Sequence, residues 1–438
     1  MADGRQWDRR SLLRGAAVVA GAAATAPLLG KTATAATASV GTDAADALFK
    51  AGKFEEAGRA YEKILNTDPT NLRAARQRGY VGLLSNRFPE AEKYLKMALH
   101  LAPDDKDTNY FLADCYMRQD KFALSARCWQ ATGDDTYAKW FAAISGEAYQ
   151  IHGDIARVEI KQMDPFPLVE ASLNGGPARR FLPYTGAPNL NLRGSVAKEA
   201  GLSPIFSEET DFGQGTVWAH YGMLDSFKLG DIELRNIPVG WSETESGEDV
   251  DTDSDGLIGT WVFYHLLTTF DYAGRSLILR RPTPEAADKA RAAAERAGVK
   301  PLPLWLAREH QLHSLGSIAG GASSGPRVVG VNFGGIGEIV AGMHGETAKQ
   351  LQIRTDYDRP VETAAHNHPV VAYPCYPKEI RLGHAVAKDV YCYTNPQAAI
   401  APFGFDLLAH LAHCFWKPYN ITLDFTDMKL YLASGKAA

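Results

Sequence analysis

The sequence predicts a multidomain protein in which an α-helical array precedes an all-β body made of two similar halves. Three observations predict this fold class. Small and aromatic residues recur every 34 residues near the N-terminus, the hydrophobic pattern changes from helical to alternating after Gly153, and blocks of the first β half return in order in the second. The length of 438 residues agrees with several domains, because single cores stop growing near ~250–300 residues.

The composition excludes one large class of partner. The chain is 45% hydrophobic and 22% charged, with a formal net charge of -5. Nucleic-acid-binding domains are instead basic, with an isoelectric point typically above ~9. We therefore expect no nucleic acid among the partners. Because no Cys-x-x-Cys and no complete metal motif occurs, we also expect no cofactor.

Residues 1–38 are predicted to be an export signal that is not part of the fold. Arg9 and Arg10 form a twin-arginine pattern, and the Ala-rich stretch 15–30 is followed by small-residue cleavage sites. This stretch is too short and too weakly apolar for a membrane span, which needs about 20 strongly apolar residues. We expect a bacterial periplasmic or secreted protein that has no membrane span once the signal is removed.

Residues 43–152 are predicted to form three helical repeats and a capping helix. Each repeat reads as two amphipathic helices, with small residues where the paired helices approach closely. The residues in step are Ala45, Gly79 and Ala113, then Phe54, Phe88 and Phe122, then Ala57, Ala91 and Ser125. This period, with Pro69 and Pro103 ending two of the units, resembles tetratricopeptide repeats.

The stretch 135–151 is predicted to cap the array, because such arrays need about three repeats and an end cap. The resemblance leaves two roles open for the array. Its concave surface binds a peptide or a partner domain, or the array is a structural arm that positions the domain after it.

The remainder of the chain divides into a first β half at 155–282, an Ala-rich helical linker at 283–303 and a second β half at 304–435. An Asn-Gly-Gly turn at Asn174 marks a hairpin in the first half. The blocks that correspond between the halves are 196–202 with 347–353, 229–239 with 382–392, 255–270 with 401–415, and 271–279 with 424–432. We interpret the halves as two copies of one β unit.

These blocks resemble the retropepsin-like and pepsin-like aspartyl proteases, in a bacterial form with tandem halves and N-terminal tetratricopeptide repeats. The motifs in the first half are the Asn174 hairpin, the Thr185-Gly186-Ala187 turn, and Asp255-Gly256 before Leu257-Ile258-Gly259. The resemblance implies a bilobal β-barrel body in which 257–259 passes behind the catalytic turn. It assigns the same role in the second half to Pro402-Phe403-Gly404.

The resemblance breaks at the residues that carry the chemistry. An aspartyl protease needs two carboxylates that share one proton, so that one is the base toward a water and the other the acid toward the carbonyl. Tyr184 and Asn332 stand at these two positions, and the turn residues after them are Thr185 and Gly186, and Phe333 and Gly334. A phenol with a pKa near ~10 is a poor base at neutral pH, and an amide does not titrate.

We therefore predict a catalytically degenerate aspartyl-protease homologue that binds peptide or protein partners through its cleft and its helical repeats. Two alternatives remain open. One is a working aspartic-type endopeptidase with an unorthodox site, for which Glu338 is the acid nearest the second turn. The other is a purely structural interaction scaffold with a collapsed cleft.

The candidate binding residues lie where hairpins of the family would cover the cleft. They are Gly213, Gln214 and Gly215 in the first half, and Tyr373 and Tyr376 in the second. A hairpin and groove of this kind bind an extended peptide by β-strand addition. The alternative is a hairpin that only packs against its own lobe.

Two weaker metal signals remain. Asp251, Asp253 and Asp255 open like a calcium loop, but the twelfth position, which should hold a Glu, is Val262. His410 and His413 would share a face of a helix, but they have no partner motif, and the same holds for the close pair His366 and His368. We therefore predict no metal site.

Five cysteines are scattered through the chain. In an oxidising compartment Cys115 and Cys128, or Cys375 and Cys392, are candidates for pairing. The alternative is buried thiols, and the sequence leaves this choice open.

Overall fold

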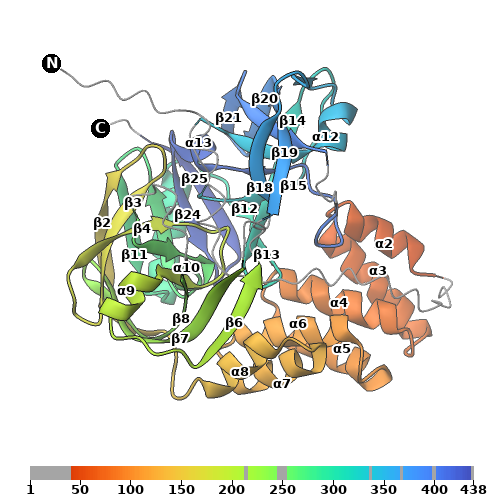
Figure 1. Ribbon diagram of the computed structural model, residues 1–438. Coiled ribbons are helices and arrows are strands. Elements are labelled where there is room, and N and C mark those ends of the chain that lie inside the picture. Colours follow the sequence, from red (N-terminus) through yellow and green to blue (C-terminus); the bar gives the residue numbers. More distant parts are fainter. Residues whose placement is uncertain are drawn as a thin grey trace.

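Two parts of different secondary structure make up the protein, a helical array and a β-rich body (Figure 1). The computed structural model describes residues 41–211, 216–243, 254–334, 338–365, 368–396 and 401–435. The predicted signal, residues 1–38, lies outside the described residues. Within the described ranges no helix is long and apolar enough to cross a membrane. The predicted fold class, a helical array followed by an all-β body, is confirmed.

The array consists of paired helices at the predicted 34-residue period. In each repeat the second helix begins at the aromatic residue of the period, Phe54, Phe88 or Phe122. Asn71 and Asp105 cap the first helix of two repeats, because their side chains accept hydrogen bonds from backbone N–H groups. The helices are α2 (Asp43–Lys50), α3 (Phe54–Thr67), α4 (Leu72–Leu84), α5 (Phe88–Leu101), α6 (Lys106–Met117) and α7 (Phe122–Thr132).

Gly79 shows why small residues recur in the array. A Cβ atom at this position on α4 would lie 2.6 Å from Cγ of Leu95 on α5, which is closer than real contacts allow. The corresponding residues Ala45 and Ala113 are fully buried. The period therefore marks the close contacts between the two helices of each pair.

Helix α8 (Asp135–Ala143) caps the array, but it is shorter than the predicted helix over 135–151. Ile144 leaves the helix with an extended backbone. Residues 150–152 form strand β1 (Gln150–His152), which pairs with a strand of the body. The apolar residues after Ala143 thus pack against the body, and the last part of the predicted repeat domain belongs to the β-sheet.

The first lobe is built from hairpins and two short helices. Asn174 has a positive φ of 48° in the turn between β3 and β4, which suits a tight hairpin. The elements are β2 (Ile155–Gln162), β3 (Leu168–Leu173), β4 (Ala178–Pro183), β5 (Leu190–Arg193), α9 (Gly194–Glu199), β6 (Phe206–Asp211), β7 (Thr216–Leu229), β8 (Ile232–Glu243), β9 (Gly256–Ile258), α10 (Thr260–Tyr264), β10 (Leu267–Asp271) and β11 (Ser276–Arg280).

The second lobe follows helix α11 (Pro284–Arg296), which lies in the predicted linker and is capped by Thr283. Its elements are β12 (Leu302–Pro303), β13 (Trp305–Ala307), β14 (Gln311–Ala319), β15 (Arg327–Val331), β16 (Ala341–His344), α12 (Gly345–Gln350), β17 (Arg354–Thr355), β18 (Val361–Ala365), β19 (His368–Tyr376), β20 (Glu379–Leu382), β21 (Ala385–Lys388), β22 (Cys392–Asn395), β23 (Ala409–Leu411), α13 (His413–Trp416), β24 (Tyr419–Asp424) and β25 (Lys429–Ser434).

A continuous sheet joins the lobes across an approximate two-fold axis. Strands β10 and β24 pair antiparallel, with Thr269 directly opposite Thr422. The two hydroxyl groups lie 2.8 Å apart. Each strand then leads into its own hairpin, β10 to β11 and β24 to β25. The antiparallel pairing of two equivalent strands places the axis between these threonines.

Each lobe has one short strand that runs parallel to the strand before its turn. In the first lobe β4 pairs with β9, and Pro183 lies opposite Ile258. In the second lobe β15 pairs with β23, and Val331 lies opposite Leu411. These two parallel contacts fix which residues of the lobes are equivalent.

The register corrects one predicted correspondence. The counterpart of Leu257-Ile258-Gly259 is His410-Leu411-Ala412 and not Pro402-Phe403-Gly404. The predicted match of 255–270 with 401–415 is therefore shifted along the chain. The error arose because Phe403-Gly404 has the same apolar-Gly pattern as Ile258-Gly259. The residue that is equivalent to Gly259 in the second lobe is Ala412.

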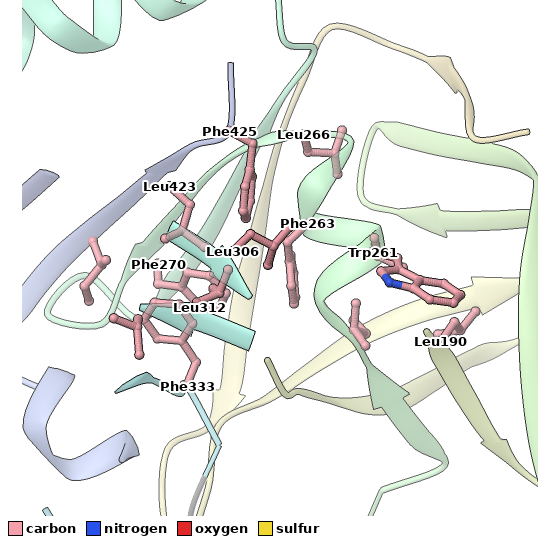
Figure 2. Packing of buried hydrophobic residues seen from close by; sticks show 14 of the residues in the cluster. Leu190, Trp261, Phe263, Leu266, Phe270, Leu306, Leu312, Phe333, Leu423 and Phe425 are labelled. Carbon is pink, nitrogen blue, oxygen red and sulfur yellow. The ribbon is translucent and has the colours of Figure 1, made fainter. Parts of the chain in front are cut away.

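The cores of the two lobes are continuous (Figure 2). Phe270 of the first lobe and Phe333 of the second stack with ring centroids 4.2 Å apart. Leu306 and Leu312, at the start of the second lobe, belong to the same buried cluster as Phe263. The lobes are therefore expected to resist separation, because parting them would expose this shared apolar surface.

The array packs against the body through α2, the start of α3, and α4. Phe405 of the second lobe lies 6.0 Å from Phe49 on α2 and 5.0 Å from Phe54, the first residue of α3, measured between ring centroids. Trp305 meets Phe54 edge to face at 4.8 Å. Tyr80 on α4 belongs to the same buried cluster. The chain's own second lobe therefore covers part of the surface of the array.

Candidate functional site

Tyr184 and Asn332 occupy equivalent positions in the two lobes. Each directly follows the strand, β4 or β15, that pairs with the short parallel strand. The backbone N–H of Tyr184 donates to the carbonyl of Ile258 at 2.9 Å, and that of Asn332 donates to the carbonyl of Leu411 at 3.1 Å. The two turns therefore begin with the same backbone geometry.

The side chains of Tyr184 and Asn332 are close enough for the amide to affect the titration of the phenol. Oδ1 of Asn332 accepts from the N–H of Gly334 at 2.8 Å. The neighbouring Asn332 amide lowers the pKa of Tyr184. Burial has the larger effect and raises the pKa of Tyr184 above its usual value. Tyr184 is therefore a neutral phenol at physiological pH.

The ring of Tyr184 lies against the glycines of both turns. A Cβ atom at Gly334 would come 1.7 Å from Cδ2 of the ring, and one at Gly186 would come 2.5 Å from Cζ. The ring also packs against a small apolar cluster that includes Leu182 and Leu257. Tyr184 thus fills the space in front of the second turn.

The side chain of Thr185 in the first turn makes hydrogen bonds to the second turn, and the equivalent residue of the second turn does not return them. Its hydroxyl accepts from the N–H of Phe333 at 3.0 Å and donates to the carbonyl of Val331 at 3.4 Å. Phe333 is the equivalent residue of the second lobe and has no hydroxyl to make the reverse pair. Its ring is instead buried against Phe270 and Trp416.

The strand behind the first turn approaches very closely, as the resemblance implied. A Cβ atom at Gly259 would lie 2.3 Å from the carbonyl oxygen of Asn189. Thr260, the next residue, donates its hydroxyl to the carbonyl of Thr185 at 3.1 Å. Glycine is therefore required where the chain passes behind the turn.

Comparison with known families agrees with this geometry. Residues 169–262 match the family described as aspartyl protease, and residues 42–106 and 85–132 match the tetratricopeptide repeat. Over these residues the chain is similar to the aspartyl proteases and carries N-terminal tetratricopeptide repeats. None of the curated proteins matches it in sequence. The protease match spans the first turn, so the likeness includes the segment that contains Tyr184.

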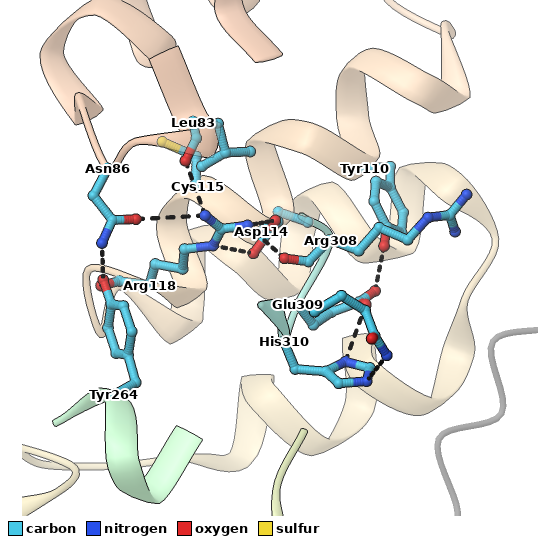
Figure 3. A network of polar contacts seen from close by, with 12 residues as sticks. Leu83, Asn86, Tyr110, Asp114, Cys115, Arg118, Tyr264, Arg308, Glu309 and His310 are labelled. Carbon is cyan, nitrogen blue, oxygen red and sulfur yellow. Dashed lines mark hydrogen bonds and ion pairs between the residues drawn. The ribbon is translucent and has the colours of Figure 1, made fainter. Parts of the chain in front are cut away.

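A buried polar network joins the repeats to Arg308, Glu309 and His310 near the start of the second lobe (Figure 3). Tyr110 on α6 donates to Oε1 of Glu309 at 2.5 Å. The neighbouring His310 donates from Nε2 to the carbonyl of Gly186 at 3.1 Å. Trp261 on α10 donates to the carbonyl of Glu309 at 2.9 Å. No sequence motif marked Glu309 and His310, because they lie outside the blocks shared by the two halves.

A buried ion pair supports the same network. Arg118 donates from Nε to Oδ1 of Asp114 at 2.8 Å, and both side chains are almost completely buried. Arg118 also donates to the carbonyl of Leu83 at 2.9 Å and to that of Arg308. Burial raises the pKa of Asp114 to about 7, although the charge of Arg118 opposes this shift.

The predicted binding residues fall in two groups. Gly213, Gln214 and Gly215 lie outside the described residues, between β6 and β7. Tyr373 and Tyr376 lie on β19, which forms a hairpin with β18, and they stand where this strand pairs with β17 and β22. The ring of Tyr376 is covered by the guanidinium of Arg354 at 4.2 Å.

The candidate metal ligands are also dispersed. Asp255 binds Arg179 at 3.3 Å and accepts from the N–H of Arg180, while Asp251 and Asp253 lie outside the described residues. His410 is on strand β23 and His413 on helix α13, so they do not share a helix face. Within the described part of the chain, no group of three or more His, Cys, Asp or Glu side chains is placed to hold a metal ion.

Proposed function

We propose that this protein does not hydrolyse peptides and instead binds a peptide or protein segment in the cleft between its lobes. One observation carries the proposal: a buried neutral phenol and an amide, Tyr184 and Asn332, stand at the two equivalent turn positions. Hydrolysis by this fold needs two carboxylates sharing a proton there. Neither side chain can take a proton from water at neutral pH.

The β-hairpins support binding of an extended chain. Strand β6 ends the strand order of the first lobe's sheet, and among the described strands it pairs with β7 alone. An edge strand presents unpaired N–H and C=O groups to which an extended peptide adds as a further strand. The family match to an aspartyl protease agrees with a peptide as the ligand class. The ring of Tyr184 narrows the middle of the cleft, so the ligand contacts lie to either side of it.

The tetratricopeptide repeats indicate a protein partner. Phe49 on α2 and Phe54 at the start of α3 already pack on Phe405 of the same chain, and Phe54 also meets Trp305. We therefore assign the external ligand to the cleft and give the repeats the role of holding the body. We also propose export through the twin-arginine route, on the strength of Arg9, Arg10 and the Ala-rich stretch that follows.

The protease match favours a second candidate, a working endopeptidase with an unorthodox site. Incubation of the purified protein with unfolded protein substrates, from acidic to neutral pH, separates the two. We expect no cleavage and no effect of a pepstatin-type inhibitor. Cleavage that disappears in Tyr184→Phe or Glu338→Gln, with the fold retained by circular dichroism, would overturn the proposal.

Binding is tested separately with a library of extended peptides and hydrogen-exchange mass spectrometry on the full chain. The proposal predicts new protection of β6 and of the Tyr184 turn when a peptide binds. Protection confined to α2–α7 would favour the interaction scaffold, with the cleft unused. Fractionation of bacteria that express the full chain tests export, and retention in the cytoplasm would contradict it.

A further inference from the structure

Cys375 on β19 and Cys392 on β22 lie directly opposite each other in an antiparallel pair. Both are thiols in this structure, and both are fully buried. Residues that are directly opposite in such a pair carry their side chains on the same face of the sheet. The two sulfur-bearing side chains therefore project into the same part of the second lobe's core.

Backbone contacts define the kind of pair these cysteines form. The carbonyl of Pro374 accepts from the N–H of Asp356, at 2.8 Å, on the side of β17. Successive residues of a strand direct their backbone groups to opposite sides, so Cys375 directs its N–H and C=O toward β22. The cysteines are thus a hydrogen-bonded pair, with Cα atoms about 5.5 Å apart. Disulfides need a Cα separation of roughly 4.4–6.8 Å, which this pair meets.

The electrostatics of the two thiols agree with this proximity. Burial raises the pKa of Cys392 to about 12 and also raises that of Cys375. Negative charge on Cys392 would raise the pKa of Cys375 further, as expected for close neighbours. A thiolate is the reactive form of cysteine, so neither residue reacts readily once the lobe has closed. Any oxidation must precede closure of the sheet or follow its local opening.

We propose that Cys375 and Cys392 form a cross-strand disulfide when the chain folds in the presence of a small-molecule disulfide. The thiolate of Cys375 attacks one sulfur of the oxidant, forms a mixed disulfide and releases one thiol. The thiolate of Cys392 then attacks the Cys375 sulfur and releases the second thiol. Two protein thiols lose two electrons and two protons, and one oxidant disulfide becomes two thiols.

The geometry also predicts that this disulfide is strained and therefore easily reduced. In a hydrogen-bonded pair the Cβ atoms lie near ~5.5 Å apart, whereas a disulfide holds them at about 3.5–4.5 Å. The strands must therefore draw together locally, and the bond is strained. Strained disulfides are reduced more easily than permanent structural ones. The pair is thus a reversible link between the base of the β18–β19 hairpin and β22.

The other candidate pair lacks this arrangement. Cys115 lies on α6 and Cys128 on α7, and Cys115 accepts from Gln119, just after the end of α6, at 3.5 Å. Burial raises the pKa of Cys128 to about 11, with no contribution from Cys115. We expect Cys115 and Cys128 to stay thiols, which makes them internal controls.

The test is to refold the reduced full chain in a mixture of reduced and oxidised glutathione and to alkylate the remaining thiols under denaturing conditions. We expect label on three of the five cysteines, and a linked peptide that joins Cys375 to Cys392. Label on every cysteine, or a different link, would overturn the proposal. Neither result depends on a variant being able to fold.

Variants sharpen the result. Cys375→Ser should leave every remaining cysteine alkylated, whereas the matched control Cys128→Ser should keep the link. The proposed strain predicts that refolding with millimolar reduced glutathione in large excess over oxidised glutathione leaves both thiols free. A Cys375–Cys392 disulfide that is present under these conditions would be a permanent structural bond and would contradict the proposed reversibility.

Discussion

The hydroxyl of Thr185 holds the backbone of Phe333, but Phe333 makes no equivalent bond in return. The hydroxyl accepts from the N–H of Phe333 at 3.0 Å and donates to the carbonyl just before the second turn. At the equivalent position the second lobe places a ring that stacks on Phe270. The first lobe therefore supplies the hydroxyl that connects the two turns. At the equivalent position the second lobe supplies apolar packing in place of hydrogen bonds.

Thr185→Val tests this one-sided connection. The change keeps the shape of the side chain but leaves the N–H of Phe333 buried without an acceptor, which costs about 1–3 kcal/mol of unfolding free energy. Urea unfolding measures the loss. The control is Thr67→Val, because Thr67 is exposed and donates only to its own helix; its effect should stay within about 0.5 kcal/mol. Equal losses in both variants would contradict the assigned role of Thr185.

Gly334→Ala tests the placement of the Tyr184 ring. The added methyl would come 1.7 Å from the ring, so we expect a loss of stability of about 1–3 kcal/mol from overpacking. In a Tyr184→Ala background the same change should cost much less, because the ring is gone. A double-mutant cycle measures this coupling. Additive effects would show that the ring does not occupy the space in front of Gly334.

Restoring carboxylates should not be enough to restore hydrolysis. We expect Tyr184→Asp with Asn332→Asp to remain inactive, since Phe333 still gives the second turn no hydroxyl. Adding Phe333→Thr supplies the missing partner for the first turn, and this triple variant should cleave unfolded protein at acidic pH, where a dyad shares one proton. Circular dichroism must show that the fold survives the loss of the buried ring. A double variant as active as the triple would contradict the role given to position 333.

Arg118→Met tests the contact between array and body. The change leaves Asp114 buried without its cation, and removal of one partner of a buried pair costs about 3–5 kcal/mol. Arg87→Met is the control, because Arg87 pairs with Glu55 at the surface, where an ion pair contributes roughly 0–1 kcal/mol. Helical and aromatic circular dichroism should report one shared unfolding transition. A helical transition that occurs alone in the wild type would show that the array does not depend on the body.

Acid should destabilise the fold through buried histidines. Burial lowers the pKa of His413 to about 4 and that of His313 to about 3. The unfolded chain takes up these protons near pH ~6.5, so the stability they contribute is full above that pH and is lost as the pH falls toward the folded values. For His413 the loss is about 3 kcal/mol.

Urea unfolding at several pH values checks this window. His413→Gln should flatten the pH dependence between about 6.5 and 4. Lys417 lowers the pKa of His413 and Asp164 raises it, so the slope also reflects these neighbours. His152→Gln is the control, because His152 is exposed. An unchanged slope in His413→Gln would contradict the assignment.

The local part of the fold, meaning the helices, strands and turns, could largely be predicted from the sequence. Helices begin where the 34-residue period predicts, at Phe54, Phe88 and Phe122. A hairpin turn occurs at Asn174, whose residue type favours the positive φ found there. Helix and strand patterns depend on neighbours within a few residues, so they can be read along the chain. The same reading failed at 144–151, where a strand pairing with β8 replaced the end of a helix.

The site was only partly visible in the sequence. Tyr184 and Asn332 could be assigned to the dyad positions from the motifs around them, but Pro402-Phe403-Gly404 was taken for the strand behind the second turn. The register of β15 with β23 identifies His410-Leu411-Ala412 instead. Glu309 and His310 had no motif at all. Their roles depend on contacts with Tyr110 and Gly186, which are far away in the chain.

The sequence by itself predicted turns without a carboxylate at Tyr184 and Asn332, because a residue's capacity to act as a carboxylate is fixed by its identity. It also determined the repeat period and the duplication. Only the tertiary structure decided that the ring of Tyr184 lies against Gly334, that the repeats pack on their own body through Phe405, and that Cys375 faces Cys392. These contacts form when distant segments of the chain pair as strands or pack their surfaces together. A local sequence pattern does not show which distant residue a side chain will contact.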